Sequence, residues 1–151
     1  MKKTNLSFKR VKKNFADIAL PHYATEGSSG MDVRATTEQP IIIESGKVIL
    51  VPTNIAVEIP LGYEIQVRPR SGLAAKNGIG LLNSPGTIDA DYRGEIKIIM
   101  FNFSDTDFTI NNGDRIAQLV LAEVIIADIV EVDELGSTAR GAGGFGHTGK
   151  R

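Results

Sequence analysis

The chain has 151 residues, of which 42% are hydrophobic and 23% charged, and its formal net charge is -1. This length suits one folded domain, and the composition is that of an ordinary globular protein rather than a disordered or membrane-embedded one, with no run near the roughly 18 apolar residues of a membrane span. The absence of cysteine excludes disulfides, thiolate nucleophiles and cysteine-based zinc sites, and it favours an intracellular, cytoplasmic location. Because no long apolar run is present, we expect no membrane partner.

The chain opens with a basic segment. No acidic residue precedes Asp17, and basic residues stand at positions 2, 3, 9, 10, 12 and 13. A nucleic-acid arm or a targeting segment would carry the same charge, but no apolar core follows it as a signal peptide requires. The basic residues alternate with Leu6, Phe8 and Val11, which favours a solvated first strand. We therefore expect no nucleic-acid partner.

Sixteen glycines, six prolines and short β-branched runs predict an all-β domain. After the first strand, we expect strands at residues 41–43, 48–51, 55–59, 63–68, 95–103, 108–110, 116–122 and 124–132. Alternation in the fourth of these turns Tyr63, Ile65 and Val67 to one face. Many short strands in one small domain predict a distorted jelly roll or β-sandwich.

One short helix is predicted, over residues 71–76, with Ser71 as its N-cap and Gly78 just past its end. From Gly136 the chain becomes rich in glycine and the apolar alternation stops. We expect residues 136–151 to form a mobile tail on the single domain 1–151, because this segment has almost nothing to bury. The tail matches G-x-G-x-x-G and most of a Walker A loop, but it lacks the flanking elements that either motif needs.

Two arginines, Arg68 and Arg70, lead straight into the predicted helix start. Arginine binds phosphate in a bidentate manner, and a free helix N-terminus offers amides and a positive dipole. A capped turn with solvated arginines explains the same segment equally well.

Acidic and basic side chains recur in two later segments. Asp89, Asp91 and Tyr92 lie on a loop that enters a strand, and a carboxylate in a phosphate-rich site can orient or deprotonate a water. Acidic loops more often merely solvate a turn. After the turn at 111–114, alternation would place Arg115 on the face opposite Gln118, where an ion pair is the simpler use of the arginine. The two histidines lack metal-ligand spacing, so no zinc site is expected.

Five segments, taken in order, resemble the five motifs of the trimeric dUTP pyrophosphatase family: residues 27–35, 68–73, 86–95, 113–119 and 140–149. The resemblance implies hydrolysis of dUTP to dUMP and pyrophosphate by attack of water on the α-phosphorus, a reaction that keeps uracil out of DNA and supplies dUMP for dTMP synthesis. It implies a Mg²⁺ cofactor held by phosphates and waters rather than by direct protein ligands. It also implies a homotrimer in which one site draws on three chains.

By this resemblance two carboxylates carry catalysis: Asp89 as the general base, and Asp32 as an outer-shell support of the water and metal network. Tyr92 would pack against deoxyribose, where a 2′-hydroxyl would clash. Asn83 and its hairpin would read uracil, and unpaired polar groups would then penalise a wrong base. The hairpin residues Thr87 and Ile88 are further expected substrate contacts.

The resemblance places the remaining substrate contacts on the phosphates and in the tail. Arg70, Ser71 and Gly72 match phosphate contacts of the second motif, and Gln118 matches that of the fourth. In the tail, Arg140 and Thr148 would hold the γ-phosphate while Phe145 stacks over uracil as the tail closes over the site. The last two expected contacts are Gly146 and His147, and many family members have serine where His147 stands.

Two other interpretations remain open. A dCTP deaminase resembles this fold, but it would be expected to lack the pattern from Asp89 to Tyr92 and the tail from Arg140 as they stand here. A non-catalytic nucleotide-binding trimer that signals through a partner is the second alternative, and an intact Asp89 argues against it.

Overall fold

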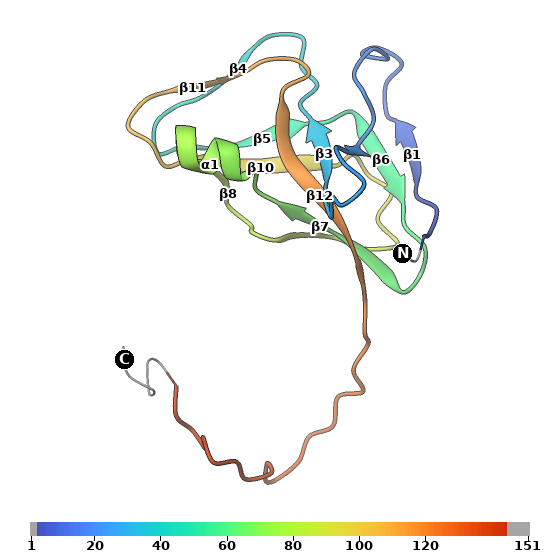
Figure 1. Ribbon diagram of the computed structural model, residues 1–151, viewed down its shortest axis with the longest axis vertical. Coiled ribbons are helices and arrows are strands. Elements are labelled where there is room, and N and C mark those ends of the chain that lie inside the picture. Colours follow the sequence, from blue (N-terminus) through green and yellow to red (C-terminus); the bar gives the residue numbers. More distant parts are fainter. Residues whose placement is uncertain (1–2, 145–151) are drawn as a thin grey trace.

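The computed structural model describes residues 3–144 of the chain, and within them it consists of short strands with one short helix (Figure 1). No helix in this range is long and apolar enough to cross a membrane. In chain order the elements are β1 (Ser7–Arg10), β2 (His22–Tyr23), β3 (Met31–Arg34), β4 (Ile41–Ile43), β5 (Val48–Pro52), β6 (Ile55–Glu58), β7 (Tyr63–Arg68), α1 (Ser71–Asn77), β8 (Ile79–Leu81), β9 (Gly86–Ile88), β10 (Lys97–Asn102), β11 (Phe108–Ile110) and β12 (Arg115–Glu123).

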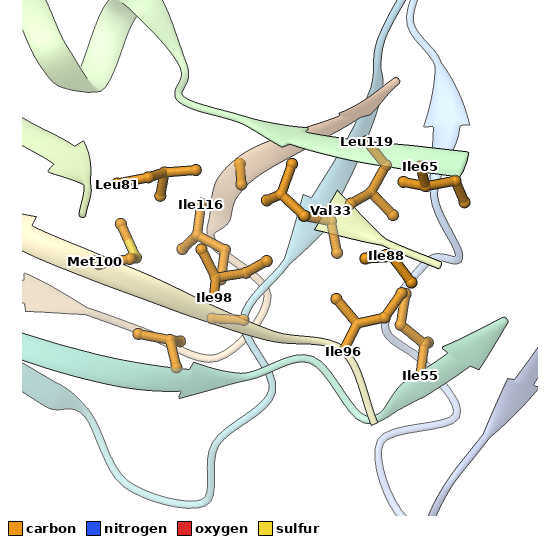
Figure 2. Packing of buried hydrophobic residues seen from close by; sticks show 14 of the residues in the cluster. Val33, Ile55, Ile65, Leu81, Ile88, Ile96, Ile98, Met100, Ile116 and Leu119 are labelled. Atoms are coloured by element: carbon orange, nitrogen blue, oxygen red, sulfur yellow. The ribbon is translucent and has the colours of Figure 1, made fainter. Parts of the chain in front are cut away.

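The strands form a β-sandwich, so the predicted jelly-roll class is confirmed. One layer is a five-stranded sheet in the order β2-β3-β12-β7-β9. Three smaller sheets, with the orders β5-β10-β8, β11-β4 and β1-β6, make up the rest of the fold. Apolar side chains of the five-stranded sheet, such as Ile65 and Leu119, face Ile98 and Met100 of β10 across the core (Figure 2). Burial of these aliphatic side chains is the main favourable term for the fold.

The five-stranded sheet has one apolar and one polar face, as the alternation in β7 predicts. Ile65 and Val67 are buried, and Tyr63 packs against the core. On the opposite face Gln66 donates a hydrogen bond to Glu64 (2.7 Å) and accepts one from Arg68 (2.7 Å). This chain of polar contacts runs along the face that the core does not cover.

The first strand is solvated, as predicted. β1 pairs in antiparallel fashion with β6, Phe8 packs against the core and Lys9 is exposed. The loop that follows is fixed by the side chain of Asn54, whose Oδ1 accepts from the Lys12 amide at 2.8 Å and whose Nδ2 donates to the Asn14 carbonyl at 3.1 Å. Lys9 and Arg10 therefore belong to the first strand, and Lys12 and Lys13 to the loop after it.

Three local predictions are wrong. Residues 124–132 form no strand: after Val124 the chain leaves the body, and Ile125 and Ile129 are 93% and 96% exposed (Figure 1). The N-cap of α1 is Arg70 rather than Ser71, and no side chain caps the helix, whereas the predicted end at Gly78 is confirmed by its left-handed φ of 65°. The alternation predicted for 115–119 also fails, because a β-bulge between Arg115 and Ala117 shifts the register.

That bulge determines where Arg115 points. With one extra residue in β12, Arg115 is opposite Arg34 while Ala117 is opposite Val33. Arg115 therefore shares the polar face with Gln118, which is opposite Asp32, and Ile116 enters the core instead. The bulge thus brings an arginine to the side of Asp32.

Asn102 is a fully buried polar residue whose side chain ties β10 to its neighbours. Its Nδ2 donates to the carbonyls of Ile43 (2.9 Å) and Thr106 (2.7 Å), and its Oδ1 accepts from the amide and the hydroxyl of Ser104 (2.9 and 2.7 Å). Every polar atom of the side chain is therefore satisfied inside the protein.

We predict that Asn102→Ala lowers the free energy of unfolding by about 2–4 kcal/mol, because it leaves buried donors and acceptors without partners. Urea denaturation at a fixed protein concentration measures the change. Asn77→Ala, at an exposed helix end, is the matched control and should shift stability by less than about 0.5 kcal/mol. Equal stability of the two variants would contradict this account of Asn102.

Candidate active site

A cavity of about 190 Å³ lies beside β9 and holds five of the predicted site residues: Asn83, Thr87, Ile88, Asp89 and Tyr92. β9 forms one wall of this cavity and pairs with β7, with Gly86 opposite Val67 and Ile88 opposite Ile65. Gly86 and Ile88 are buried, and Thr87 between them is exposed on the other face of the sheet. Asp89 follows the strand directly and is exposed. In the described part of the chain, its carboxylate has no hydrogen-bond or ion-pair partner.

Close packing around two glycines fixes the polar side chains of this cavity. A Cβ atom on Gly86 would lie 2.9 Å from Nδ2 of Asn83, so only glycine lets the Asn83 amide approach the strand. A Cβ on Gly94 would lie 2.4 Å from the hydroxyl oxygen of Tyr92. That hydroxyl donates to the carbonyl of Glu95 at 3.0 Å.

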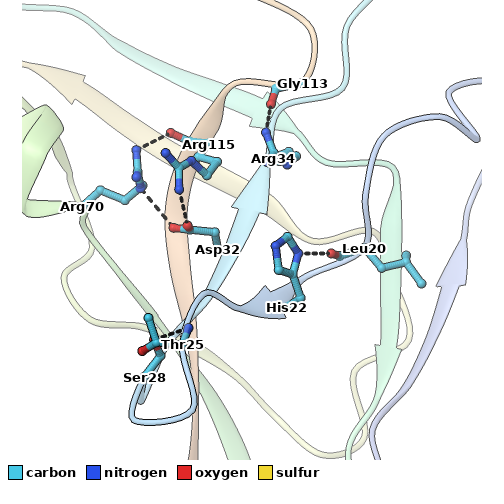
Figure 3. A network of polar contacts seen from close by, with 9 residues as sticks. All are labelled: Leu20, His22, Thr25, Ser28, Asp32, Arg34, Arg70, Gly113 and Arg115. Carbon is cyan, nitrogen blue, oxygen red and sulfur yellow. Dashed lines mark hydrogen bonds and ion pairs between the residues drawn. The ribbon is translucent and has the colours of Figure 1, made fainter.

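A second group of predicted residues surrounds Asp32 on β3 (Figure 3). The Asp32 side chain is 9% exposed, and each of its oxygens accepts from a different arginine: Oδ1 from Arg70 Nε and Oδ2 from Arg115 Nη1, both at 3.0 Å. Arg70 Nη1 also donates to the carbonyl of Arg115 at 3.2 Å. One carboxylate therefore orients two guanidinium groups whose remaining N–H donors are available to an anion.

Gln118 lies beside this cluster because it is opposite Asp32 in the β3–β12 ladder and opposite Arg68 in the β12–β7 ladder. A Cβ on Gly30 would come within 3.0 Å of the Gln118 side-chain oxygen, so glycine leaves room for this side chain. Ser71 and Gly72, the first residues of α1, are exposed next to Arg70.

The two groups lie far apart in one chain. Ile88 is opposite Ile65, so Asp89 lies near the level of Glu64, whereas Gln118 brings Asp32 to the level of Arg68. Four residues along β7 and three strand spacings across the sheet place the Cα atoms of Asp32 and Asp89 about 20 Å apart. Asp89 and the arginine cluster cannot contact the same phosphate within one chain.

Of the predicted contacts in the tail, only Arg140 lies among the described residues. Arg140 is exposed on the segment that leaves the body after β12, and its Nε donates to the carbonyl of Gly143 at 2.7 Å. The predicted contacts Phe145, Gly146, His147 and Thr148 lie outside the described residues.

Residues 3–144 contain no group of three histidine, aspartate or glutamate side chains arranged to hold a metal ion. Magnesium commonly keeps several waters and takes substrate phosphates as ligands, so it does not need such a group. Each Asp32 oxygen can accept a further hydrogen bond, for example from a metal-bound water, while it keeps its arginine.

Sequence reasoning misses two parts of the site. The ion pair predicted for Arg115 is confirmed, but the sequence does not indicate that its partner is Asp32. No periodic signal shows the bulge that brings them together. The space that Gly94 provides for Tyr92 is also missed, although the Tyr-Arg-Gly-Glu stretch at 92–95 places the glycine only two residues from the ring.

We predict that Asp32→Asn lowers the free energy of unfolding by about 1–3 kcal/mol, because the change leaves two adjacent arginines without their shared anion. Urea unfolding at constant m-value measures the loss. Asp105→Asn, at an exposed turn, is the control with the same charge change and should be near neutral. If both variants lose the same stability, the Asp32 cluster does not hold the two arginines as described.

Comparison with known proteins identifies the family. The family model described as dUTPase matches residues 16–149. A deoxyuridine 5'-triphosphate nucleotidohydrolase of Bdellovibrio bacteriovorus is 53% identical over 150 residues and covers 99% of both chains. One from Fusobacterium nucleatum is 58% identical over 133 residues, 88% of this chain and 91% of its own.

Solved structures agree with these sequence matches. The dUTPase of Staphylococcus bacteriophage 80alpha bound to dUpNHpp superposes with a TM-score of 0.85 at 25% identity, covering 97% of this chain and 99% of that one. A mutant dUTPase from phage phi11 of S. aureus, described with a structural Mg(II) ion, gives a TM-score of 0.77 at 22% identity over 89% of this chain and all of that one, a likeness of fold. The chain belongs to the dUTPase family.

Proposed function

We propose that this protein is a dUTP diphosphatase, which hydrolyses dUTP to dUMP and pyrophosphate by attack of water on the α-phosphorus. The observation that carries the proposal is the cavity beside β9, where an exposed carboxylate, Asp89, lies next to Asn83 and Tyr92. Relatives that are more than half identical over most of the chain bear the corresponding enzyme name. The proposed role is to keep uracil out of DNA and to supply dUMP for dTMP synthesis, in the cytoplasm, where deoxynucleotides are consumed.

Asp89 is the proposed general base. Its carboxylate has no partner among the described residues, so it is free to accept a proton from a water held near the α-phosphorus. The oxygen of that water forms a new bond to the α-phosphorus, the bond from this phosphorus to the bridging oxygen breaks, and pyrophosphate leaves with the electron pair. Asp89 holds the proton removed from the water.

The arginine cluster is the proposed phosphate site. Arg70, held by Asp32, lies beside the exposed first residues of α1, Ser71 and Gly72, and Gln118 is opposite Asp32 in the β3–β12 ladder. Negative charge that develops on the leaving phosphates would be stabilised by these fixed donors. Magnesium, when bound through phosphate oxygens and waters, would neutralise further charge, and Asp32 would accept a hydrogen bond from its outer shell.

Selectivity is proposed to come from the cavity and the tail. Asn83 and the hairpin at Thr87 and Ile88 would contact uracil, while the Tyr92 ring would lie against the sugar. Residues 136–151 would form a mobile tail that closes over the site, with Arg140 on the γ-phosphate. Phe145, Gly146, His147 and Thr148 complete the proposed contacts of this tail.

Assembly into a homotrimer with shared sites is the last part of the proposal. The separation of about 20 Å between Asp89 and the Asp32 cluster supports it, because strand spacing alone keeps the two apart in one chain. The exposed apolar residues of the segment after β12 also support assembly. Ile125, Ile126 and Ile129 are each more than four-fifths exposed, and a second copy could cover them.

Product analysis tests the proposed function. The protein is incubated with magnesium and, separately, with dUTP, dCTP, dTTP or UTP, and the products are resolved by anion-exchange chromatography beside chelator controls. We expect only dUTP to be converted to dUMP and pyrophosphate, and the chelator to stop the conversion. Deamination of dCTP would instead indicate the deaminase alternative, and tight dUTP binding without turnover would favour the signalling trimer.

We predict that Asp89→Asn binds dUTP with a nearly unchanged Kd but lowers kcat at least about 100-fold, because an amide cannot accept the proton from water. Isothermal titration with a non-hydrolysable analogue and steady-state kinetics separate the two effects. Asp91→Asn, an exposed carboxylate two residues away, is the matched control and should retain its kcat. Near-normal turnover of Asp89→Asn would exclude it as the base.

Shared sites predict complementation between two inactive variants. Asp89→Asn and Arg70→Ala damage different halves of the site, so a co-refolded equal mixture should form some sites with both halves intact. For random assembly with the halves on different chains, about a quarter of the sites are complete, and activity should recover to about that fraction. Each variant refolded alone is the control. A mixture as inactive as its components would mean that each chain builds its own site.

A further inference from the structure

Tyr92 is held in place by two features of the chain that follows it. Its hydroxyl donates to the Glu95 carbonyl at 3.0 Å, and its ring lies directly against the backbone of Gly94. A Cβ atom on Gly94 would lie 2.4 Å from the Tyr92 hydroxyl oxygen, 2.6 Å from Cζ and 3.0 Å from Cε2. No side chain larger than hydrogen fits at residue 94 while the ring stays where it is.

The backbone that carries these contacts is itself fixed. The Glu95 side chain accepts a hydrogen bond from the backbone amide of Asn54 at 2.9 Å, and the backbone amide of Ile96 donates to the Ile55 carbonyl at 2.8 Å. The Glu95 carbonyl that accepts from Tyr92 therefore lies between two groups, the Glu95 side chain and the Ile96 amide, that are both hydrogen-bonded to the chain at the start of β6. The Tyr92 ring packs on a rigid support.

The need for glycine at residue 94 comes from space rather than from backbone conformation. Gly78 and Gly113 have φ angles of 65° and 85°, where a side chain is strained, but Gly94 is not among the glycines with positive φ. Alanine can therefore adopt the Gly94 backbone. The clash is with the far end of a side chain that is 46% exposed, so the ring can move away with the loss of one exposed hydrogen bond and at little cost in stability.

We propose that Gly94 is a specificity-determining positioning residue, which sets the place of the Tyr92 ring and through it the discrimination between deoxyribose and ribose. The inference rests on the proposed function and on the sugar-facing role of Tyr92 within it. A methyl group at residue 94 displaces the ring from the Glu95 carbonyl and from the sugar. The space that a 2′-hydroxyl needs is then open, and UTP becomes a better substrate relative to dUTP.

The test measures kcat/KM for dUTP and for UTP in the full-length protein and in Gly94→Ala, Tyr92→Ala and the double variant. We expect the dUTP-to-UTP ratio to fall at least about tenfold in Gly94→Ala, with a melting temperature close to that of the wild type. Because Gly94 acts through Tyr92, the double variant should show the same ratio as Tyr92→Ala alone. Gly27→Ala, whose Cβ would meet no atom within 4 Å, is the control and should leave the ratio unchanged.

Two results would overturn the inference while the proposed function stands. One is a Gly94→Ala enzyme that hydrolyses dUTP with an unchanged ratio although Tyr92→Ala relaxes it. The other is a double variant whose loss of selectivity is the product of the two single losses, since that would mean independent action. A wild-type protein that does not hydrolyse dUTP would refute the proposed function itself and the inference with it.

Discussion

The pairing of the five-stranded sheet is the constraint on which the rest of the proposed mechanism depends. Because β9 and β12 pair with β7 on either side, Asp89 is fixed near the start of that strand and the Asp32 cluster near its end. Strand pairing fixes the backbone at Asp89, and Asp32 orients the arginines, but the two groups lie about 20 Å apart. In the proposed mechanism, another copy of the chain completes a site that brings water, base and phosphate donors together.

Each half of the proposed site is supported by contacts within the chain itself. Two arginines share the buried carboxylate of Asp32, so their like charges are held together by one anion before any phosphate binds. In the cavity, Gly86 and Gly94 give Asn83 and Tyr92 the space in which they lie. Such preorganisation means that the donors need little rearrangement as charge develops.

Much of the fold was predictable from local sequence. Alternation indicates β7, and β-branched runs indicate most of the longer strands, but β2, β3, β8 and β9 have only two to four residues, too few for a period to show. The apolar run 124–132 has the composition of a strand but pairs with no strand among residues 3–144, and strand formation needs a neighbour as well as a propensity. The bulge at Arg115 is likewise a feature of how β12 pairs with β3, so the local sequence does not reveal it.

The candidate residues are assigned by resemblance, and the structure adds how they are held. Resemblance could name Asp32 and Arg70, but only the folded chain shows that they form an ion pair with Arg115 as a third member.

Hydrolysis of dUTP in ¹⁸O-labelled water is the most direct test of the central claim, that water attacks the α-phosphorus. The account predicts the label in dUMP and none in pyrophosphate, whereas label in pyrophosphate would contradict it.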